Sequence, residues 1–295
     1  MIWKEQKFYL TLLFPAILLL ILFIAAPIGQ SFLLSIHRMI IGLPQLKTPF
    51  VGLDNYRELL DDPVARNSFW VTVIFVGTTT FFELLIGILL ALIIHRQFPS
   101  RGALRACVLV PWAIPTVVAA QMWRFLFSDA YGMINYAVFG ADTTKYIPWL
   151  ALPSTALLSI IVADIWKTSS FAALLILAGL QVIPEELYHA ARVDGAAAWR
   201  RFWHITWPLI RPALLVTLLF RTIDAFRVFD LAFVMTQGGP ADATNVLQLY
   251  GYKKMLVEGC MGYGSAISVS IFIIVLILAI LYVRSIGRQL IEAST

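Results

Sequence analysis

The sequence has little charge. Asp, Glu, Lys and Arg together make up 13% of its 295 residues, about half of the share that is typical of a soluble globular domain. The mean hydropathy is +0.83, and nearly all of the charge lies between long apolar runs. This excludes a soluble globule and is typical of a helical protein that crosses a membrane several times. The formal net charge of +5 is not gathered on one segment, which argues against a nucleic-acid partner.

Cysteine is also scarce. Cys107 lies near one end of an apolar run, and Cys260 lies in a loop that we place on the opposite side of the membrane. A disulfide requires Cα atoms within about 7 Å, so we expect the two thiols to remain unpaired.

Catalytic motifs are missing too. The chain contains no GxxxxGK[ST] phosphate loop, so it cannot hydrolyse ATP by that route. It also has no HExxH or GxSxG motif, and its four histidines are scattered at His37, His95, His189 and His204. These absences argue against an enzyme, and no metal or cofactor is expected on this chain.

Six apolar runs are long enough to cross a bilayer as helices, which takes about 20 residues each. They cover approximately residues 8–34, 69–94, 105–128, 154–180, 208–234 and 263–283. With the N-terminus inside, the inner segments carry eleven Lys and Arg against five acids, and the outer loops carry seven against eight. Because basic residues favour the cytoplasmic side, we expect both termini inside and one all-α transmembrane domain over residues 1–295.

The predicted inner loop at residues 181–207 is polar and rich in alanine, between two apolar runs. Pro184 suits the first turn of a helix, where Glu185 and Glu186 lie at the positive end of the helix dipole. Gly195 should break or bend this helix, and a second helix should stop at Pro208. Small residues on one face would let another protein approach the backbone, whereas an amphipathic helix lying in the membrane interface is an equally good interpretation of the pattern.

Eight ionisable residues fall inside the apolar runs, where they are costly and usually face a cavity or a partner. They are Glu83, Arg124, Asp164, Lys167, Arg221, Asp224, Arg227 and Asp230. Their charges sum to zero, which favours pairing between helices. On a helical wheel the last four wind across half of the circumference, which predicts that they cannot all face one channel. Glu83 and Arg124 are interpreted as structural, and Arg227 and Asp230 as lying at the outer end.

Several stretches resemble one family of membrane proteins. "HAARVDG" followed by "ITWP" resembles the EAA loop of ATP-binding-cassette (ABC) importer permeases, with Ala190, Ala191, Gly195, Ile205 and Pro208 matching the motif. His189 stands where the motif has Glu, and Trp207 stands where it has Leu. "PWAIPTVVAAQMWRFLFS", "FRTIDAFRVFDLAFVMTQGGP" and "MGYGSAISV" look like the third, fifth and sixth spans of carbohydrate-uptake permeases, so the resemblance covers nearly the whole chain.

The resemblance implies a permease subunit of an ATP-driven sugar or glycoside importer working by alternating access. Its partners would be a second homologous permease, two ABC ATPase subunits that bind ATP and Mg²⁺, and an extracytoplasmic sugar-binding protein. The ATPase would dock on a coupling helix formed by Glu185, Glu186, His189, Ala190, Ala191, Asp194 and Gly195.

The same resemblance assigns the substrate pathway to the fourth and fifth spans. Polar and aromatic side chains there could bind a hydroxyl-rich ligand. The candidates are Asp164, Lys167, Thr168, Phe171, Arg221, Asp224, Ala225 and Val228. Two alternatives stay open: the charged residues could only join helices, or they could relay protons in a stand-alone secondary transporter. The second alternative would leave the polar loop unexplained.

Overall fold

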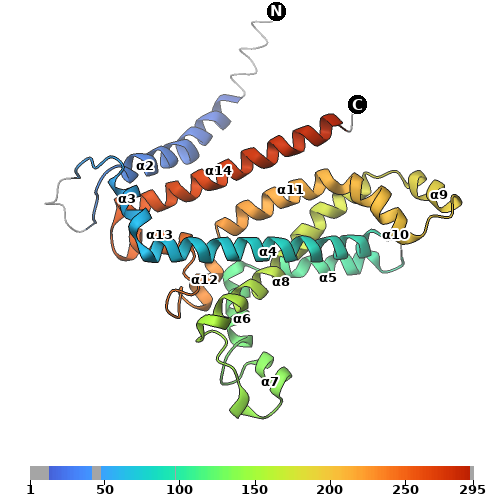
Figure 1. Ribbon diagram of the computed structural model, residues 1–295, viewed down its shortest axis with the longest axis horizontal. Coiled ribbons are helices and arrows are strands. Elements are labelled where there is room, and N and C mark those ends of the chain that lie inside the picture. Colours follow the sequence, from blue (N-terminus) through green and yellow to red (C-terminus); the bar gives the residue numbers. More distant parts are fainter. Residues whose placement is uncertain (1–12, 42–47, 97, 293–295) are drawn as a thin grey trace, which may run out of the picture. The chain divides into compact units, whose positions relative to one another are not determined.

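The structure is a computed structural model that describes residues 13–41, 48–96 and 98–292, and the start of the predicted first span, residues 8–12, lies outside them. The described residues form helices and no strand (Figure 1). The chain makes two compact units, one from the described parts of residues 1–66 and 250–273 and the other from those of residues 67–249 and 274–295. Cys107 and Cys260 are both free, as predicted.

Four helices are long and apolar enough to cross a membrane. They are Leu13–Ser35, which includes the π-helical turn η1 (Ile21–Ala25) and α2 (Ala26–Ser35), α4 (Pro63–His95), α8 (Pro153–Gln181), and the part of α14 (Met261–Glu292) up to Ser285. A bent pair of helices, α5 (Arg101–Ala113) and α6 (Thr116–Leu126), could form a fifth span. Helix α11 (Trp207–Phe226) does not belong to this apolar group, because it contains three charged residues, Arg211, Arg221 and Asp224.

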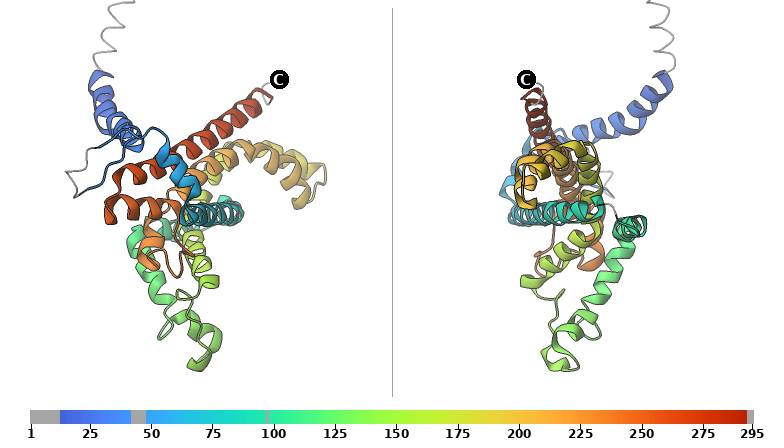
Figure 2. Two further views of the ribbon diagram at one scale, coloured as in Figure 1. Left: turned by 60° about the vertical axis from the view of Figure 1, so that its left-hand side comes forward. Right: turned by 90° about the vertical axis from the view of Figure 1, so that its right-hand side faces the viewer.

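Two of the predicted continuous spans are broken in the structure. The run 105–128 turns by 89° between α5 and α6, which leave the break in different directions (Figure 2). Pro115 causes this break, because a residue before proline is driven out of helical geometry, and Ile114 is extended. The run 208–234 also divides, since α11 ends at Phe226 and the short helix α12 (Asp230–Met235) follows.

The core of the larger unit is built around α8, which is the most buried of the candidate spans and packs against α5, α6, α11 and α12. Small residues allow the closest approaches. A Cβ on Gly87 of α4 would lie 2.9 Å from Ala172, and one on Gly179 of α8 would lie 2.3 Å from Ala213. Apolar side chains of α4, α8 and α11 fill the adjoining space, among them Ala91, Ile94, Ile176, Leu177, Leu180 and Ile210.

In the smaller unit one partly buried carboxylate, that of Asp62, accepts four hydrogen bonds. The short helix α3 (Asp54–Asp61) ends directly before Asp62, which caps α4 by accepting hydrogen bonds from the Val64 and Ala65 amides. The hydroxyls of Tyr250, in α13 (Leu247–Tyr252), and Tyr263 donate to the other oxygen. Burial raises the pKa of Asp62, but these four hydrogen bonds favour the charged form more strongly, and the net pKa lies below 3.8.

The segment between α6 and α8, predicted as an outer loop, folds on itself through short elements. It contains α7 (Met133–Phe139) and a 3₁₀ turn, η2 (Thr143–Lys145). Asn135 is fully buried, and its amide donates to the carbonyls of Ser128 and Ile147. Further along the chain, α13 continues into the π-helical turn η4 (Lys253–Val257) ahead of α14.

Candidate functional site

A network of buried charge joins α4, α8 and α11 inside the larger unit. Arg221 is its centre and is only 2% exposed. Its Nε lies 2.6 Å from Glu83 Oε2 and its Nη2 lies 2.9 Å from Glu83 Oε1, a bidentate pair across two helices. Nη1 donates to Asp224 Oδ2 at 2.6 Å, and Asp164 Oδ2 lies 3.6 Å from Nη2. One guanidinium therefore contacts three carboxylates.

The burial of these carboxylates is unequal. Glu83 is fully buried and also accepts a short hydrogen bond from Thr168, whereas the side chain of Asp224 is 69% exposed. Thr168 belongs to α8 and is tied to the Glu83–Arg221 pair through Glu83. The interpretation of Glu83 as structural is consistent with this pairing, but the same residue positions Arg221 and Thr168, two of the predicted substrate contacts.

Lys167 lies beside this network and has different partners. Its ammonium donates to Ile114 O at 2.6 Å and to Trp112 O at 3.2 Å, the carbonyls freed where α5 breaks before Pro115. Lys167 is 7% exposed, and both of its hydrogen bonds are partly buried. Lys167 therefore stabilises the bend between α5 and α6 through these two hydrogen bonds.

Replacing Lys167 with methionine should destabilise the protein by about 1–3 kcal/mol, because the partly buried carbonyl of Ile114 would lose a charged donor. The thermal unfolding of the purified protein in detergent measures this. Lys145→Met is the matched control, since its ion pair with Asp142 is largely exposed and is worth about 1 kcal/mol or less. Equal stability of the two variants would show that the Lys167 contacts do not hold the bend.

A cavity of about 440 Å³ lies next to the charge network, within the range of about 300–1,000 Å³ that is usual for small-molecule sites. Seven of the eight predicted pathway residues line it: Asp164, Lys167, Thr168, Arg221, Asp224, Ala225 and Val228. Phe171 does not; it stacks on Trp112, whose ring centroid is 5.5 Å away and which does line the cavity. Sequence reasoning missed Trp112 and Ile114–Thr116, although the prolines of "PWAIP" were a signal for exposed backbone there.

The helical-wheel prediction for the fifth span was wrong. Arg227 and Asp230 line the same cavity as Arg221 and Asp224, together with Phe229. The wheel assumed one continuous helix, but the backbone leaves helical geometry between Phe226 and Asp230. That break changes the direction of the later side chains and brings all four charges to one cavity. Arg124, which was interpreted as structural, is exposed and donates from α6 to Val234 O of α12 at 3.4 Å.

The polar loop forms two helices with a glycine turn between them, as predicted. The first is α9 (Glu185–Val193), with Glu185 and Glu186 in its first turn. It ends at Gly195, whose φ is +74°, with the Ala196 amide donating to Ala191 O and the Gly195 amide to Arg192 O. This hydrogen-bond pattern is a Schellman motif, and it requires a residue that tolerates the left-handed conformation.

The prediction that the second helix stops at Pro208 was wrong. The short α10 (Ala198–Arg201) passes through the π-helical turn η3 (Phe202–Thr206) directly into α11. Proline in a helix lacks its amide donor and crowds the preceding turn, and the wider π-helical turn just before Pro208 accommodates both effects. The loop is thereby continuous with the helix that carries Arg221.

The loop presents its small and polar residues outward. Ala190, Asp194 and Gly195 are exposed, and Arg192 Nη2 lies 3.0 Å from His189 Nδ1. Large apolar side chains are exposed around them, with Val182 at 81%, Val193 at 88% and Trp199 at 71%. Apolar side chains gathered on an exposed loop are typical of a surface that contacts another molecule.

The binding-protein-dependent transport system inner membrane component family matches residues 83–292 of this chain. This match covers α8, α11 and the polar loop, and therefore both sites described above. The chain belongs to this family. It is accordingly an inner membrane component of a transport system, and from here on we refer to it as the permease.

Characterised relatives resemble the permease over nearly its whole length. It is 40% identical over 288 residues to the trehalose/maltose transport system permease protein MalF of Thermococcus litoralis, covering 97% of this chain and 95% of the relative. It is 39% identical to the sulfoquinovosyl glycerol transport system permease protein SmoG of Agrobacterium fabrum, covering 94% and 90%. The trehalose transport system permease protein SugA of Mycobacterium tuberculosis is 37% identical, covering 96% and 90%.

The fold also matches a solved structure. A chain of a bacterial ABC transporter involved in the import of the polysaccharide alginate superposes with a TM-score of 0.82, covering 97% of the permease and 98% of that chain at 24% identity. This likeness establishes the fold of an ABC transporter permease.

Proposed function

We propose that the permease forms half of the membrane pathway of an ATP-driven importer for a sugar or glycoside. In this proposal α11 and the α5–α6 pair cross the bilayer with the four apolar helices, which gives six spans with both termini in the cytoplasm. A second homologous permease supplies the other half. Two ABC ATPase subunits bind ATP and Mg²⁺, and an extracytoplasmic binding protein delivers the substrate.

The cavity beside Arg221 is the observation that carries this proposal. Its lining includes three acids, Asp164, Asp224 and Asp230, and three bases, Lys167, Arg221 and Arg227. This balance favours a neutral ligand with many hydroxyls over a phosphate ester, which would require an excess of cations. Trp112 and Phe229 add aromatic rings on which a sugar ring can stack. A disaccharide or a glucosylated osmolyte fits these properties, and the similarity to the trehalose and maltose permeases supports the same substrate class.

The polar loop is proposed as the docking site of the ATPase. Helix α9 carries Glu185, Glu186 and His189. Its C-terminal end and the turn after it carry the small residues Ala190, Ala191 and Gly195, together with Asp194. ATP binding would close the ATPase dimer and draw the α9 helices of the two permeases together. Because the loop continues through η3 into α11, this movement would reach Arg221 and Asp224 through one helix. The cavity would thereby alternate between the two sides of the membrane.

ATPase stimulation tests the proposed function and its substrate. The assembled transporter is purified in nanodiscs, and ATP hydrolysis is measured with a panel of binding proteins, each with and without its sugar. We expect stimulation by a binding protein loaded with a neutral disaccharide or glycoside and little by the same protein without ligand. Uptake that continues without any ATPase subunit would contradict the proposal and favour a secondary transporter.

A further inference from the structure

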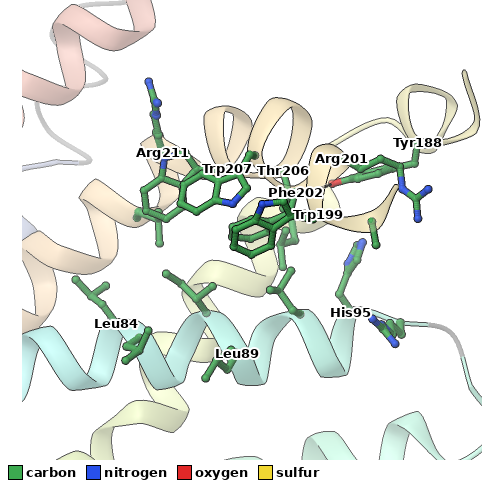
Figure 3. A pocket seen from close by; sticks show the side chains of 18 of the residues that line it. Leu84, Leu89, His95, Tyr188, Trp199, Arg201, Phe202, Thr206, Trp207 and Arg211 are labelled. Atoms are coloured by element: carbon green, nitrogen blue, oxygen red, sulfur yellow. Dashed lines mark hydrogen bonds between the residues drawn. The ribbon is translucent and has the colours of Figure 1, made fainter. Parts of the chain in front are cut away.

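A second and larger cavity lies between α4 and the segment that runs from α9 to α11 (Figure 3). Its volume is about 1500 Å³, above the range of about 300–1,000 Å³ that is usual for small-molecule sites. It shares no lining residue with the polar cavity beside Arg221. It is therefore separate from the proposed sugar site, and its size suits a larger ligand.

One wall is a single face of α4. The residues that line it recur every three or four positions, which is the spacing of one helix face. They are Phe81, Leu84, Leu85, Ile88, Leu89, Leu92 and His95, and Arg96 directly follows the helix. From Phe81 to Leu92 this face is apolar for about 16 Å at 1.5 Å per residue, and it then becomes cationic. The large side chains of Phe81, Leu85 and Leu89 are exposed.

The opposite wall is also apolar. Leu214, Leu215 and Leu218 of α11 line it, followed by the aromatic residues of the loop. Phe202 and Trp207 face Leu84 of α4 across the open space (Figure 3). The aromatic rings pack on one another, and the centroids of Trp203 and Trp207 are 5.5 Å apart. The cavity is therefore a groove with two apolar walls.

The end of the groove near His95 is cationic. It is lined by Arg96, directly after α4, by Arg192 of α9 and by Arg201 of α10, together with two histidines, and Glu185 is the one acid among its described lining residues. Internal contacts hold two of these arginines: Arg192 Nε donates to Tyr188 O at 3.3 Å, and Arg201 Nη1 donates to Ala196 O at 2.7 Å. Arg211 also lines the cavity, but its side chain points away from α4 (Figure 3).

We propose that this groove binds an anionic phospholipid. The phosphate would lie against Arg96, Arg192 and Arg201, and the acyl chains would lie along α4 and α11. The apolar candidate span of α4 ends at His95, so the cationic end lies at the depth where lipid headgroups begin. Basic pockets between helices at that depth suit anionic headgroups. A transmembrane helix of a partner would cover the apolar walls but would supply no anion to Arg96, Arg192 and Arg201.

Lipid binding by the assembled transporter tests this inference. The complex is reconstituted in phosphatidylcholine nanodiscs that contain a little spin-labelled phosphatidylglycerol, and the immobilised lipid is measured by electron paramagnetic resonance. One basic side chain near a membrane surface strengthens the binding of anionic lipid about fivefold. The double variant Arg96→Gln/Arg192→Gln should therefore bind spin-labelled phosphatidylglycerol about 25-fold more weakly. The matched control Arg211→Gln should bind it as the unaltered complex does.

Two outcomes would overturn the inference. One is unchanged phosphatidylglycerol binding by the double variant. The other is a photo-crosslinking residue at position 89 that forms its adduct with a protein subunit, since Leu89 lies on the apolar wall where acyl chains are expected. An adduct with lipid supports the inference. A complex that imports sugar normally but binds no phosphatidylglycerol would remove the lipid site and leave the proposed transport function intact.

Discussion

Arg221→Met is expected to destabilise the permease by about 3–5 kcal/mol, because it leaves the buried carboxylate of Glu83 without its partner. Glu83 is fully buried, and the remaining Thr168 hydrogen bond cannot balance its charge. Denaturation of the purified permease in detergent, followed by tryptophan fluorescence, measures the loss. The matched control is Arg227→Gln, an exposed arginine just past the end of the same helix, which should cost less than about 1 kcal/mol.

A paired substitution separates the structural role of Arg221 from its proposed role in transport. Glu83→Leu/Arg221→Met replaces the ion pair with apolar side chains of similar volume, which often restores stability. We expect the double variant to recover most of the stability lost in Arg221→Met and still to import no sugar, because the cavity would lack its central donor. Restored uptake would show that the pair only joins α4 to α11. Full stability of Arg221→Met would contradict the first expectation.

Gly195→Asp is expected to abolish uptake while the permease remains inserted in the membrane. A Cβ on Gly195 meets no atom within 4 Å in the chain, so the new side chain projects outward into the proposed ATPase interface. The left-handed backbone, with φ of +74°, adds only about 1–2 kcal/mol of local strain. Transport and co-purification of the ATPase subunits should both be lost, because a charged side chain would separate the docking surfaces.

Gly140→Asp is the matched control for that experiment. Gly140 follows α7, has a φ of +63°, and an added Cβ there also meets nothing within 4 Å. The strain is at least as large as at Gly195, because the φ of +63° and ψ of −140° of Gly140 form a conformation that few residues other than glycine adopt. The substitution lies in a predicted outer loop, however, so the ATPase should still co-purify. Retention of the ATPase by Gly195→Asp, or full transport by that variant, would contradict docking at this loop.

Local sequence patterns were sufficient for much of this protein. Long apolar runs determined the helical membrane class, because a chain in lipid must satisfy its own backbone hydrogen bonds. Gly195 and Pro184 predicted the shape of the polar loop, since the conformations that they allow are set by their own covalent structure. The zero sum of the eight intramembrane charges predicted that they would be paired, because an isolated charge there is too costly.

Only the tertiary structure decided which of those charges share a site. Glu83 lies 138 residues before Arg221, and no local pattern specifies that the two form a bidentate pair. The break after Phe226 brings Arg227 and Asp230 to the same cavity, and Lys167 finds its carbonyls at a bend that Pro115 creates in another helix. Side-chain direction depends on where each helix bends and on which helix packs beside it. Both of these depend on contacts between residues that are far apart in the sequence.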